Sequence, residues 1–152
     1  MPSPLFWLML GTLVALAIAS VRRIPEGQVY SLRRVGGQTR IVGAGMHFLL
    51  PLVERVSHKI SLTGSALPID GALASGESVR GALYFQVLDP ARADIVIESV
   101  DQLLRETTRR MLARDDAPSD SSEQRGWLKQ KLNAEFRERG LLVTRVDLRT
   151  AD

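Results

Sequence analysis

The sequence contains no cysteine and no long run of basic residues, and each absence excludes classes of protein. Without cysteine among its 152 residues, the chain can form no disulfide, no zinc–thiolate site and no cysteine nucleophile. Its 20 basic residues stand against 17 acidic ones and are spread along the chain, which argues against a nucleic-acid-binding protein. The composition, 45% apolar and 24% charged, is that of a globular chain with room for about one domain.

Motifs for catalysis and ligand binding are also missing. The glycines of Gly43–Gly45 are not followed by the third glycine of a dinucleotide loop, and no lysine–serine pair follows for a P-loop. The two histidines, His47 and His58, have no partners at metal-ligand spacing, so we predict a structural role for His47. No nucleophile, base and orienting group occur together. We therefore expect no enzymatic activity, no metal and no cofactor.

The longest apolar run lies at the front of the chain. Leu5 to Val21 carries no charge in 17 residues, which as a helix would cover about 26 Å of a hydrocarbon core of about 30 Å. A cleaved signal peptide is the alternative, because Ala17 and Ala19 fit a small-residue cleavage pattern, but the first four residues lack a basic side chain. We therefore predict an uncleaved transmembrane anchor over residues 1–22. The assigned anchor residues are Leu5, Phe6, Trp7, Leu8, Leu10, Leu13, Leu16, Ile18 and Val21.

Basic residues directly after this run predict its orientation. Arg22 and Arg23 follow the apolar run, and further arginines follow within the next two dozen residues. By the positive-inside rule, this distribution predicts a single-pass protein of the plasma (inner) membrane, with its N-terminus outside and its C-terminal domain in the cytoplasm.

Two segments after the anchor are typical of β-strands. Residues 26–42 predict a hairpin, because Gly36–Gly37 separates two β-like runs and glycine tolerates the positive φ of a tight turn. Residues 79–88 alternate, which places Val79, Leu83, Phe85 and Val87 on one face of a half-buried strand.

The second half of the chain predicts helices and a closing strand. Asp89–Pro90 is typical of a helix start, and that helix should run to about Glu98. Ser99 with Gln102 predicts a capping box for a longer helix. Residues 114–124 predict a flexible loop, and residues 122–139 a last helix that ends at Gly140. The longer helix should bury five apolar residues: Val100, Leu103, Leu104, Met111 and Leu112. The last helix should bury Leu128, Leu132 and Phe136. The closing strand should align Leu142, Thr144, Val146 and Leu148 on one face.

These patterns together predict an α+β fold. We expect an N-terminal transmembrane helix, then a small domain in which two to three helices pack on a mostly antiparallel sheet.

The order of the segments resembles one family of membrane proteins. Residues 24–56, "IPEGQVYSLRRVGGQTRIVGAGMHFLLPLVERV", residues 81–93, "GALYFQVLDPARA", and residues 141–148, "LLVTRVDL", look like the stomatin/prohibitin/flotillin group, the SPFH or band 7 domain. No single segment is specific, but the ordered set is. The matching residues are Pro25, Glu26, Gly27, Gly45, His47, Phe48, Pro51, Tyr84, Val87, Asp89, Pro90, Gly140, Val143, Thr144 and Val146.

The resemblance implies a function as well as a fold. It implies that residues 23–152 form an SPFH domain of a non-enzymatic membrane scaffold that self-associates into a homo-oligomer and organises membrane microdomains. Its partners would be membrane lipids and a membrane protein such as a protease or channel, with no nucleic acid. We expect no coiled coil after the closing strand, in contrast to most of the family. The alternative is a signal-anchored, monomeric adaptor module outside the cytoplasm.

Two sets of residues are candidates for contacts. An apolar segment beside the anchor either fills the domain core or dips into the membrane interface, and the sequence leaves both open. Its members are Phe48, Leu49, Leu50 and Leu52. Charged residues of the longer helix and the following loop can form contacts between copies, or can be an ordinary solvated face. These are Arg105, Arg109, Arg110, Asp115 and Asp116, with Asp120 as a further acidic partner.

Overall fold

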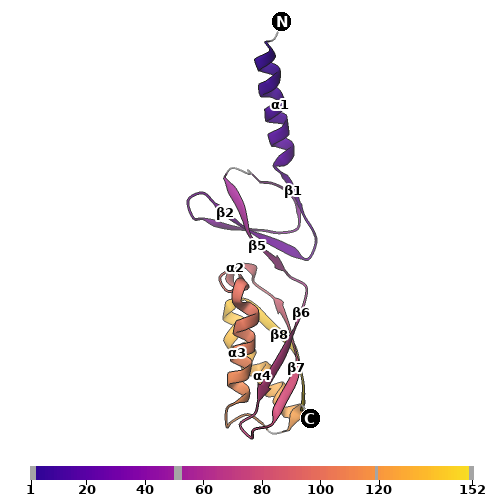
Figure 1. The fold of residues 1–152 in the computed structure, drawn as a ribbon, viewed down its shortest axis with the longest axis vertical. Coiled ribbons are helices and arrows are strands. Elements are labelled where there is room, and N and C mark those ends of the chain that lie inside the picture. Colours follow the sequence, from indigo (N-terminus) through magenta and orange to yellow (C-terminus); the bar gives the residue numbers. More distant parts are fainter. Residues whose placement is uncertain (1–2, 50–52, 119, 151–152) are drawn as a thin grey trace. The chain divides into compact units, whose positions relative to one another are not determined.

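A computed structural model describes residues 3–49, 53–118 and 120–150 (Figure 1). The chain divides into two compact units, Met1–Lys59 and Ile60–Asp152. The first contains one helix and small sheets, and the second contains a three-stranded sheet with two long helices. Both units mix helices with antiparallel strand pairs, as the sequence predicted for an α+β fold.

The N-terminal helix is shorter than the sequence predicted. Helix α1 covers Pro4–Ala19, 16 residues, or about 24 Å at 1.5 Å per residue. Ser20 is its C-cap, with its hydroxyl donating to the Leu16 carbonyl oxygen at 2.7 Å, and Val21 already belongs to strand β1. Among the described residues no helix is both long and apolar enough to cross a membrane. The prediction of a transmembrane helix over residues 1–22, with its single-pass topology, is therefore wrong.

Strand pairing accounts for the early end of this helix. Strand β1 (Val21–Ile24) pairs antiparallel with β4 (Gly45–Phe48), and Val21 lies opposite Phe48. The backbone carbonyl of Ser20 accepts a hydrogen bond from the Leu49 N–H at 2.8 Å. The last residue of the apolar run thus exchanges helical hydrogen bonds for those of a β-ladder.

The predicted hairpin is confirmed. Strand β2 (Gln28–Arg34) pairs antiparallel with β3 (Thr39–Val42), with the two glycines at positive φ in the turn. Strand β5 (Glu54–Ser61) pairs with the other edge of β2. The core of the first unit is a small cluster of buried side chains from these strands and from the residue after β4. Its members are Ile24, Leu32, Val42 and Leu49.

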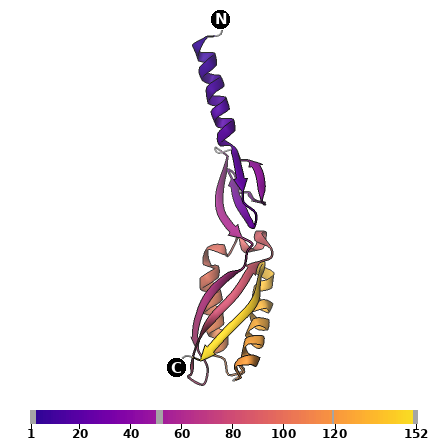
Figure 2. The ribbon, with the colours of Figure 1, turned by 90° about the vertical axis from the view of Figure 1, so that its right-hand side faces the viewer.

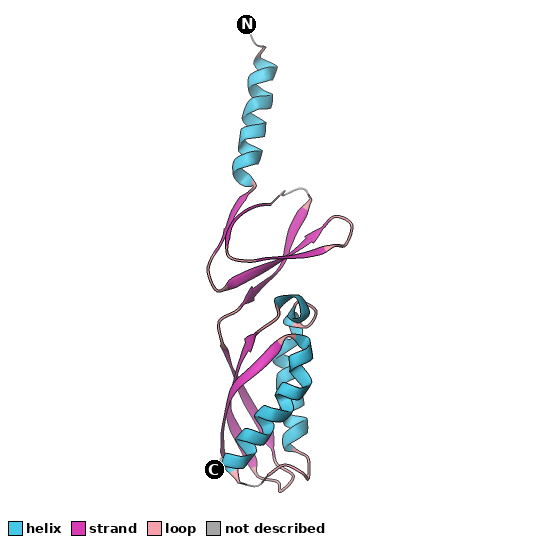
Figure 3. Ribbon diagram, turned by 180° about the vertical axis from the view of Figure 1, so that it is seen from behind, coloured by secondary structure: helices cyan, strands magenta, loops and turns pink. Residues whose placement is uncertain are grey.

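In the second unit, one sheet carries both long helices on the same face (Figure 2 and Figure 3). Its order is β6–β7–β8, all antiparallel, from β6 (Ser65–Ala72), β7 (Ser78–Val87) and β8 (Leu141–Thr150). Helix α3 packs on β6, and helix α4 packs on β8. The face predicted for the central strand is confirmed, since its four apolar residues are all buried: Val79, Leu83, Phe85 and Val87.

A bulge changes the faces of the closing strand. The register places Tyr84 opposite Arg145 and Phe85 opposite Val143, so Thr144 is an extra residue. Its hydroxyl donates to the Tyr84 carbonyl oxygen at 3.1 Å. The predicted alignment of Leu142 and Thr144 with Val146 and Leu148 is therefore wrong. The buried face instead carries Leu141, Val143, Val146 and Leu148.

The helical segments follow the prediction in part. Asp89 caps helix α2 (Pro90–Ala93), which is shorter than predicted and is followed by a 3-10 turn, Ile97–Ser99. Helix α3 (Val100–Leu112) lacks the predicted capping box, because the Ser99 side chain donates back to the Val96 carbonyl. It buries Thr107 and Thr108 where the prediction had Leu103 and Met111, which are only half-buried.

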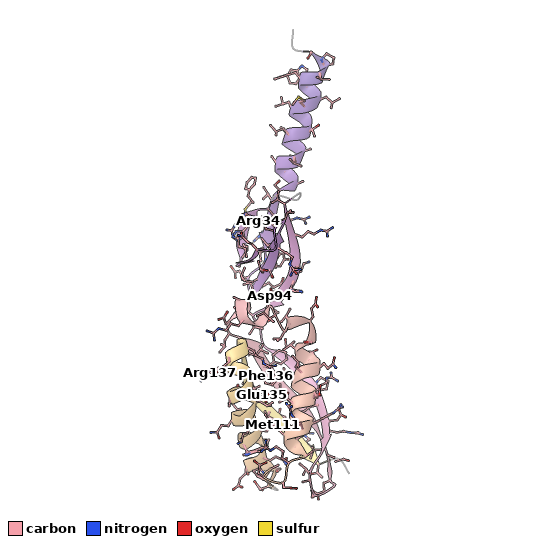
Figure 4. The ribbon with its side chains drawn as sticks, turned by 90° about the vertical axis from the view of Figure 1, so that its left-hand side faces the viewer. Arg34, Asp94, Met111, Glu135, Phe136 and Arg137 are labelled. Atoms are coloured by element: carbon pink, nitrogen blue, oxygen red, sulfur yellow. The ribbon has the colours of Figure 1, made fainter. Side chains whose placement is uncertain are left out.

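The last helix is close to its prediction. Helix α4 (Ser121–Phe136) continues into a 3-10 turn, Arg137–Arg139, before Gly140. Its predicted stripe of Leu128, Leu132 and Phe136 is fully buried, and Phe136 is labelled in Figure 4 near the end of this helix. The loop predicted over residues 114–124 is shorter in the structure, since α4 already begins at Ser121.

One tight junction connects the ends of β7 and α4. The Gly140 carbonyl oxygen accepts from the N–H groups of Leu88 (2.8 Å) and Asp89 (3.1 Å). Gly140 has φ +77°, and a Cβ there would overlap the Asp89 carbonyl oxygen. Only glycine fits this position without moving the start of α2.

The buried face of β7 generates a first prediction. Phe85→Ala removes a buried ring, so we expect the free energy of unfolding to fall by about 3–5 kcal/mol through lost burial and a cavity. Chemical denaturation monitored by circular dichroism measures this. An unchanged unfolding midpoint would contradict the assignment of Phe85 to the core.

Two glycines should respond oppositely to the same substitution. Gly140→Ala should destabilise the protein by at least about 1–2 kcal/mol, because alanine must take a left-handed conformation and meets Asp89. Gly126→Ala, inside α4 with open space around it, should stabilise the protein by about 0.5–1 kcal/mol. Thermal unfolding of the two variants compares them directly, and an unchanged or raised melting temperature of Gly140→Ala would contradict the junction.

Candidate membrane-contact and self-association surfaces

Helix α1 exposes apolar side chains on every side. None of its described residues is buried, and Leu8 and Leu13, for example, are 71% and 65% exposed. An amphipathic surface helix would carry a polar face opposite its apolar one, and α1 has none. Nothing in the described parts of the chain covers it. An exposed apolar surface of this kind is typical of a site that contacts a membrane or another protein.

The apolar segment after this helix divides between core and surface. Phe48, at the end of β4, is 72% exposed, and Met46 on the same strand is 74% exposed. Leu49 is buried in the core of the first unit. The core alternative that the sequence left open therefore holds for Leu49, while Phe48 is exposed and its contact with the membrane interface stays a prediction. Leu50 and Leu52 lie outside the described residues.

A basic pocket of about 420 Å³ lies in the first unit at the end of α1. Four cationic side chains line it, from β1 and β5: Arg22, Arg23, Arg55 and Lys59. The acidic residue at the pocket, Glu54, has a side chain only 5% exposed and pairs with Arg34 at 2.8 Å (Figure 4 labels Arg34). The accessible charge of the pocket is therefore positive, a property that its scattered sequence positions did not reveal.

His47 has the structural role predicted for it. Its Nε2 lies 3.0 Å from the Gly43 carbonyl oxygen, across the turn that leads into β4. Within residues 3–49, 53–118 and 120–150, no cluster of three or more histidine or acidic side chains is arranged to hold a metal.

The charged residues predicted for self-association are in large part occupied within the chain. Arg109 binds Asp70, with its Nη2 2.8 Å from both carboxylate oxygens. Arg110 pairs with Glu135 of α4 at 3.4 Å, and Asp116 pairs with Arg114 at 2.9 Å. Arg105 and Asp115 have no ion-pair partner in the described part of the chain. An intermolecular contact through these five residues stays a prediction.

The further acidic candidate, Asp120, caps helix α4. It accepts hydrogen bonds from the Ser122 hydroxyl and from the backbone N–H groups of Ser122 and Glu123. The Ser122 hydroxyl and these N–H groups lower the pKa of Asp120. The carboxylate of Asp120 is therefore engaged within the chain, where it caps the first turn of α4.

The edges of the three-stranded sheet are partly blocked, which the sequence analysis missed. Arg109 also donates its Nε–H to the Asp70 backbone carbonyl at 3.0 Å, so this carbonyl points away from β7. Pro68, two residues earlier on the same edge, has no N–H to offer. On the other edge, the Asn133 amide bonds both the N–H (2.7 Å) and the carbonyl (3.0 Å) of Val143. The proline within a strand was the only one of these signals visible in the sequence.

Known proteins match part of this sequence, although no family model matches it. Over 103 residues the chain is 30% identical to an uncharacterized protein of Schizosaccharomyces pombe, covering 62% of this chain and 29% of that protein. It is 27% identical over 95 residues to a stomatin-like protein of Caenorhabditis elegans (57% of this chain, 29% of the relative). The human mitochondrial stomatin-like protein 2 is 26% identical over 103 residues (60% and 28%).

These relatives make the chain distantly similar to stomatin-like proteins, in agreement with the resemblance seen in its motifs. The chain spans less than a third of the length of each.

The blocked edge of β6 leads to a prediction. Pro68→Val combined with Arg109→Ala restores one N–H and releases one carbonyl on this edge, so we expect edge-to-edge pairing and larger species. Size-exclusion chromatography with light scattering in mild detergent measures this. The loss of the exposed Arg109–Asp70 pair itself should change the free energy of unfolding by no more than about 1 kcal/mol.

Arg110→Ala is the matched control for this prediction, because it removes an arginine of the same helix that does not reach the edge. If the double variant has the same size distribution as the wild type, the edge contacts do not prevent association.

Proposed function

We propose that the protein is a non-enzymatic, membrane-associated scaffold of the SPFH type, in which residues 23–152 form the SPFH domain. The observation that carries this proposal is the apolar surface of α1, exposed on every side next to a basic pocket. The distant similarity to stomatin-like proteins supports the family. The motifs absent from the sequence, rather than any feature of the fold, favour a scaffold over an enzyme.

The membrane contact has two physical parts. Burying one large aliphatic or aromatic side chain contributes about 1.5–3 kcal/mol, and α1 offers several. Exposed Met46 and Phe48 extend this apolar surface onto β4. We therefore assign membrane contact to the apolar residues of α1 together with Phe48, and we remove Leu49 from that set because it is needed in the core.

Self-association is the second part of the proposed function. Arg105 and Asp115 are the members of the predicted set whose charges remain available, while the sheet edges are partly blocked. Weak contacts between copies become effective on a membrane, because confinement to two dimensions raises the local concentration. Organising membrane microdomains, or modulating a membrane protein such as a protease or channel, would follow from such an array.

Charges placed on α1 test the membrane contact. Leu8→Asp with Leu13→Asp should abolish flotation of the full chain with phosphatidylcholine vesicles, because each buried carboxylate opposes insertion into an apolar phase. Flotation on a density gradient after removal of detergent measures the bound fraction.

Ile95→Asp supplies the control, since Ile95 is an apolar residue of the second unit that is 86% exposed and should tolerate a charge. If wild-type protein fails to float, or the α1 variant floats equally well, the proposed membrane contact is wrong. Crosslinking on the same vesicles tests self-association, and an exclusively monomeric wild type would favour the adaptor alternative.

A further inference from the structure

The basic pocket at the end of α1 has the composition of an anion site. Among the described residues, the side chains of Arg22, Arg23 and Arg55 have no hydrogen-bond or ion-pair partner, so their guanidinium groups are available to a ligand. Lys59 lies over the Tyr30 ring, with Nζ 5.5 Å from the ring centroid, which holds its stem against the first unit. Guanidinium groups bind phosphate through paired N–H donors, and an ammonium group adds a point charge.

The acidic side chain in the pocket does not cancel this charge. Glu54 is shielded from solvent and its Oε1 accepts from Arg34, a residue that does not line the pocket. The negative charge of this carboxylate is therefore already paired with Arg34. The lining of the pocket therefore contains four cationic residues and one acidic residue, which is already paired.

The position of the pocket indicates where such a ligand comes from. Ala19, the last residue of α1, and the apolar side chains of Leu49 and Val56 form part of its lining. A molecule bound there has its anionic group among the arginines and lies next to the apolar helix. A free phosphate would use only the first of these features, and an anionic lipid would use both.

We propose that this pocket binds the phosphate-containing headgroup of an anionic lipid. The inference rests on the proposed membrane contact and adds a lipid preference to it. The apolar helix accounts for binding to any bilayer, and the pocket accounts for additional binding to bilayers that contain anionic lipid.

Flotation of the full chain at limiting lipid separates these two contributions. The probes are vesicles of phosphatidylcholine alone and vesicles with one fifth phosphatidic acid or phosphatidylserine. Wild type should bind more strongly to both anionic compositions. Arg55→Ala with Lys59→Ala should lose about 30-fold in apparent affinity for them, since each basic residue near an anionic surface contributes about a factor of five. Binding of this variant to phosphatidylcholine should be unchanged.

Arg33→Ala with Arg40→Ala is the matched control. It removes the same charge from β2 and β3 of the same unit, away from the pocket. This pair should lose less than about threefold, because neither arginine lines the pocket and salt screens exposed charges outside it. Equal losses in the two double variants would overturn the pocket in favour of general charge attraction.

Two further outcomes are distinct. If wild type binds phosphatidylcholine and anionic vesicles equally, the headgroup proposal is wrong while the membrane contact stands. If it binds neither, the proposed function itself fails. In the last arm, inorganic phosphate is added to the protein at constant ionic strength and the melting temperature is measured. If phosphate raises the melting temperature of wild type, and wild type shows no preference for anionic vesicles, the pocket binds free phosphate and the lipid assignment is overturned.

Discussion

The carbonyl oxygen of Gly140 is the acceptor on which the arrangement of the second unit depends. By accepting the N–H groups of both Leu88 and Asp89, it fixes the end of the central strand against the start of the closing one. The same aspartate then caps α2 through its side chain, since Asp89 Oδ1 accepts from Ala91 and Arg92. The end of β7, the cap of α2 and the start of β8 therefore meet at this junction, so a change at Gly140 affects all three elements.

This junction gives a physical reason for two of the motifs in the sequence. The Asp–Pro pair after β7 supplies a cap and a preset φ for the first helical position. The glycine before β8 supplies the left-handed conformation that the close approach requires. These residues lie about fifty positions apart in sequence, and the fold places them in direct contact. Each motif is weak alone, and the hydrogen bonds between them explain why both occur.

Side chains from the helices occupy parts of both edges of the same sheet. Arg109 of α3 reaches the Asp70 carbonyl on β6, and Asn133 of α4 binds Val143 on β8. Open edges favour uncontrolled pairing with other chains, and these contacts reduce that tendency. A protein that gathers on a surface is at particular risk, because confinement raises the local concentration of edges along with that of any intended interface.

Local patterns predicted much of the fold from the sequence, and long-range contacts explain where they failed. The hairpin, the buried face of β7 and the stripe of α4 follow from alternation, helical spacing and turn residues. The prediction of a transmembrane helix was wrong because Val21, the last residue of the apolar run, pairs with β4 instead of continuing the helix. Hydropathy alone cannot reveal such a strand pairing. The faces of β8 were wrong because a one-residue bulge reverses them. The basic pocket was missed since its four cations come from two strands separated in sequence.

The energies of the two membrane-contact features indicate separate roles for them. A basic residue near an anionic bilayer contributes about 1 kcal/mol, and salt weakens that contribution. A single leucine moved from water into hydrocarbon contributes more, and α1 exposes several such side chains over about four turns. In the proposed function, the apolar helix therefore supplies most of the affinity for a membrane. The four cations of the pocket contribute less in the same proposal, and their part is a preference among lipids rather than the membrane contact itself. If copies gather on one membrane, as the proposed function requires, a lipid bound by one copy also raises the concentration of that lipid for its neighbour.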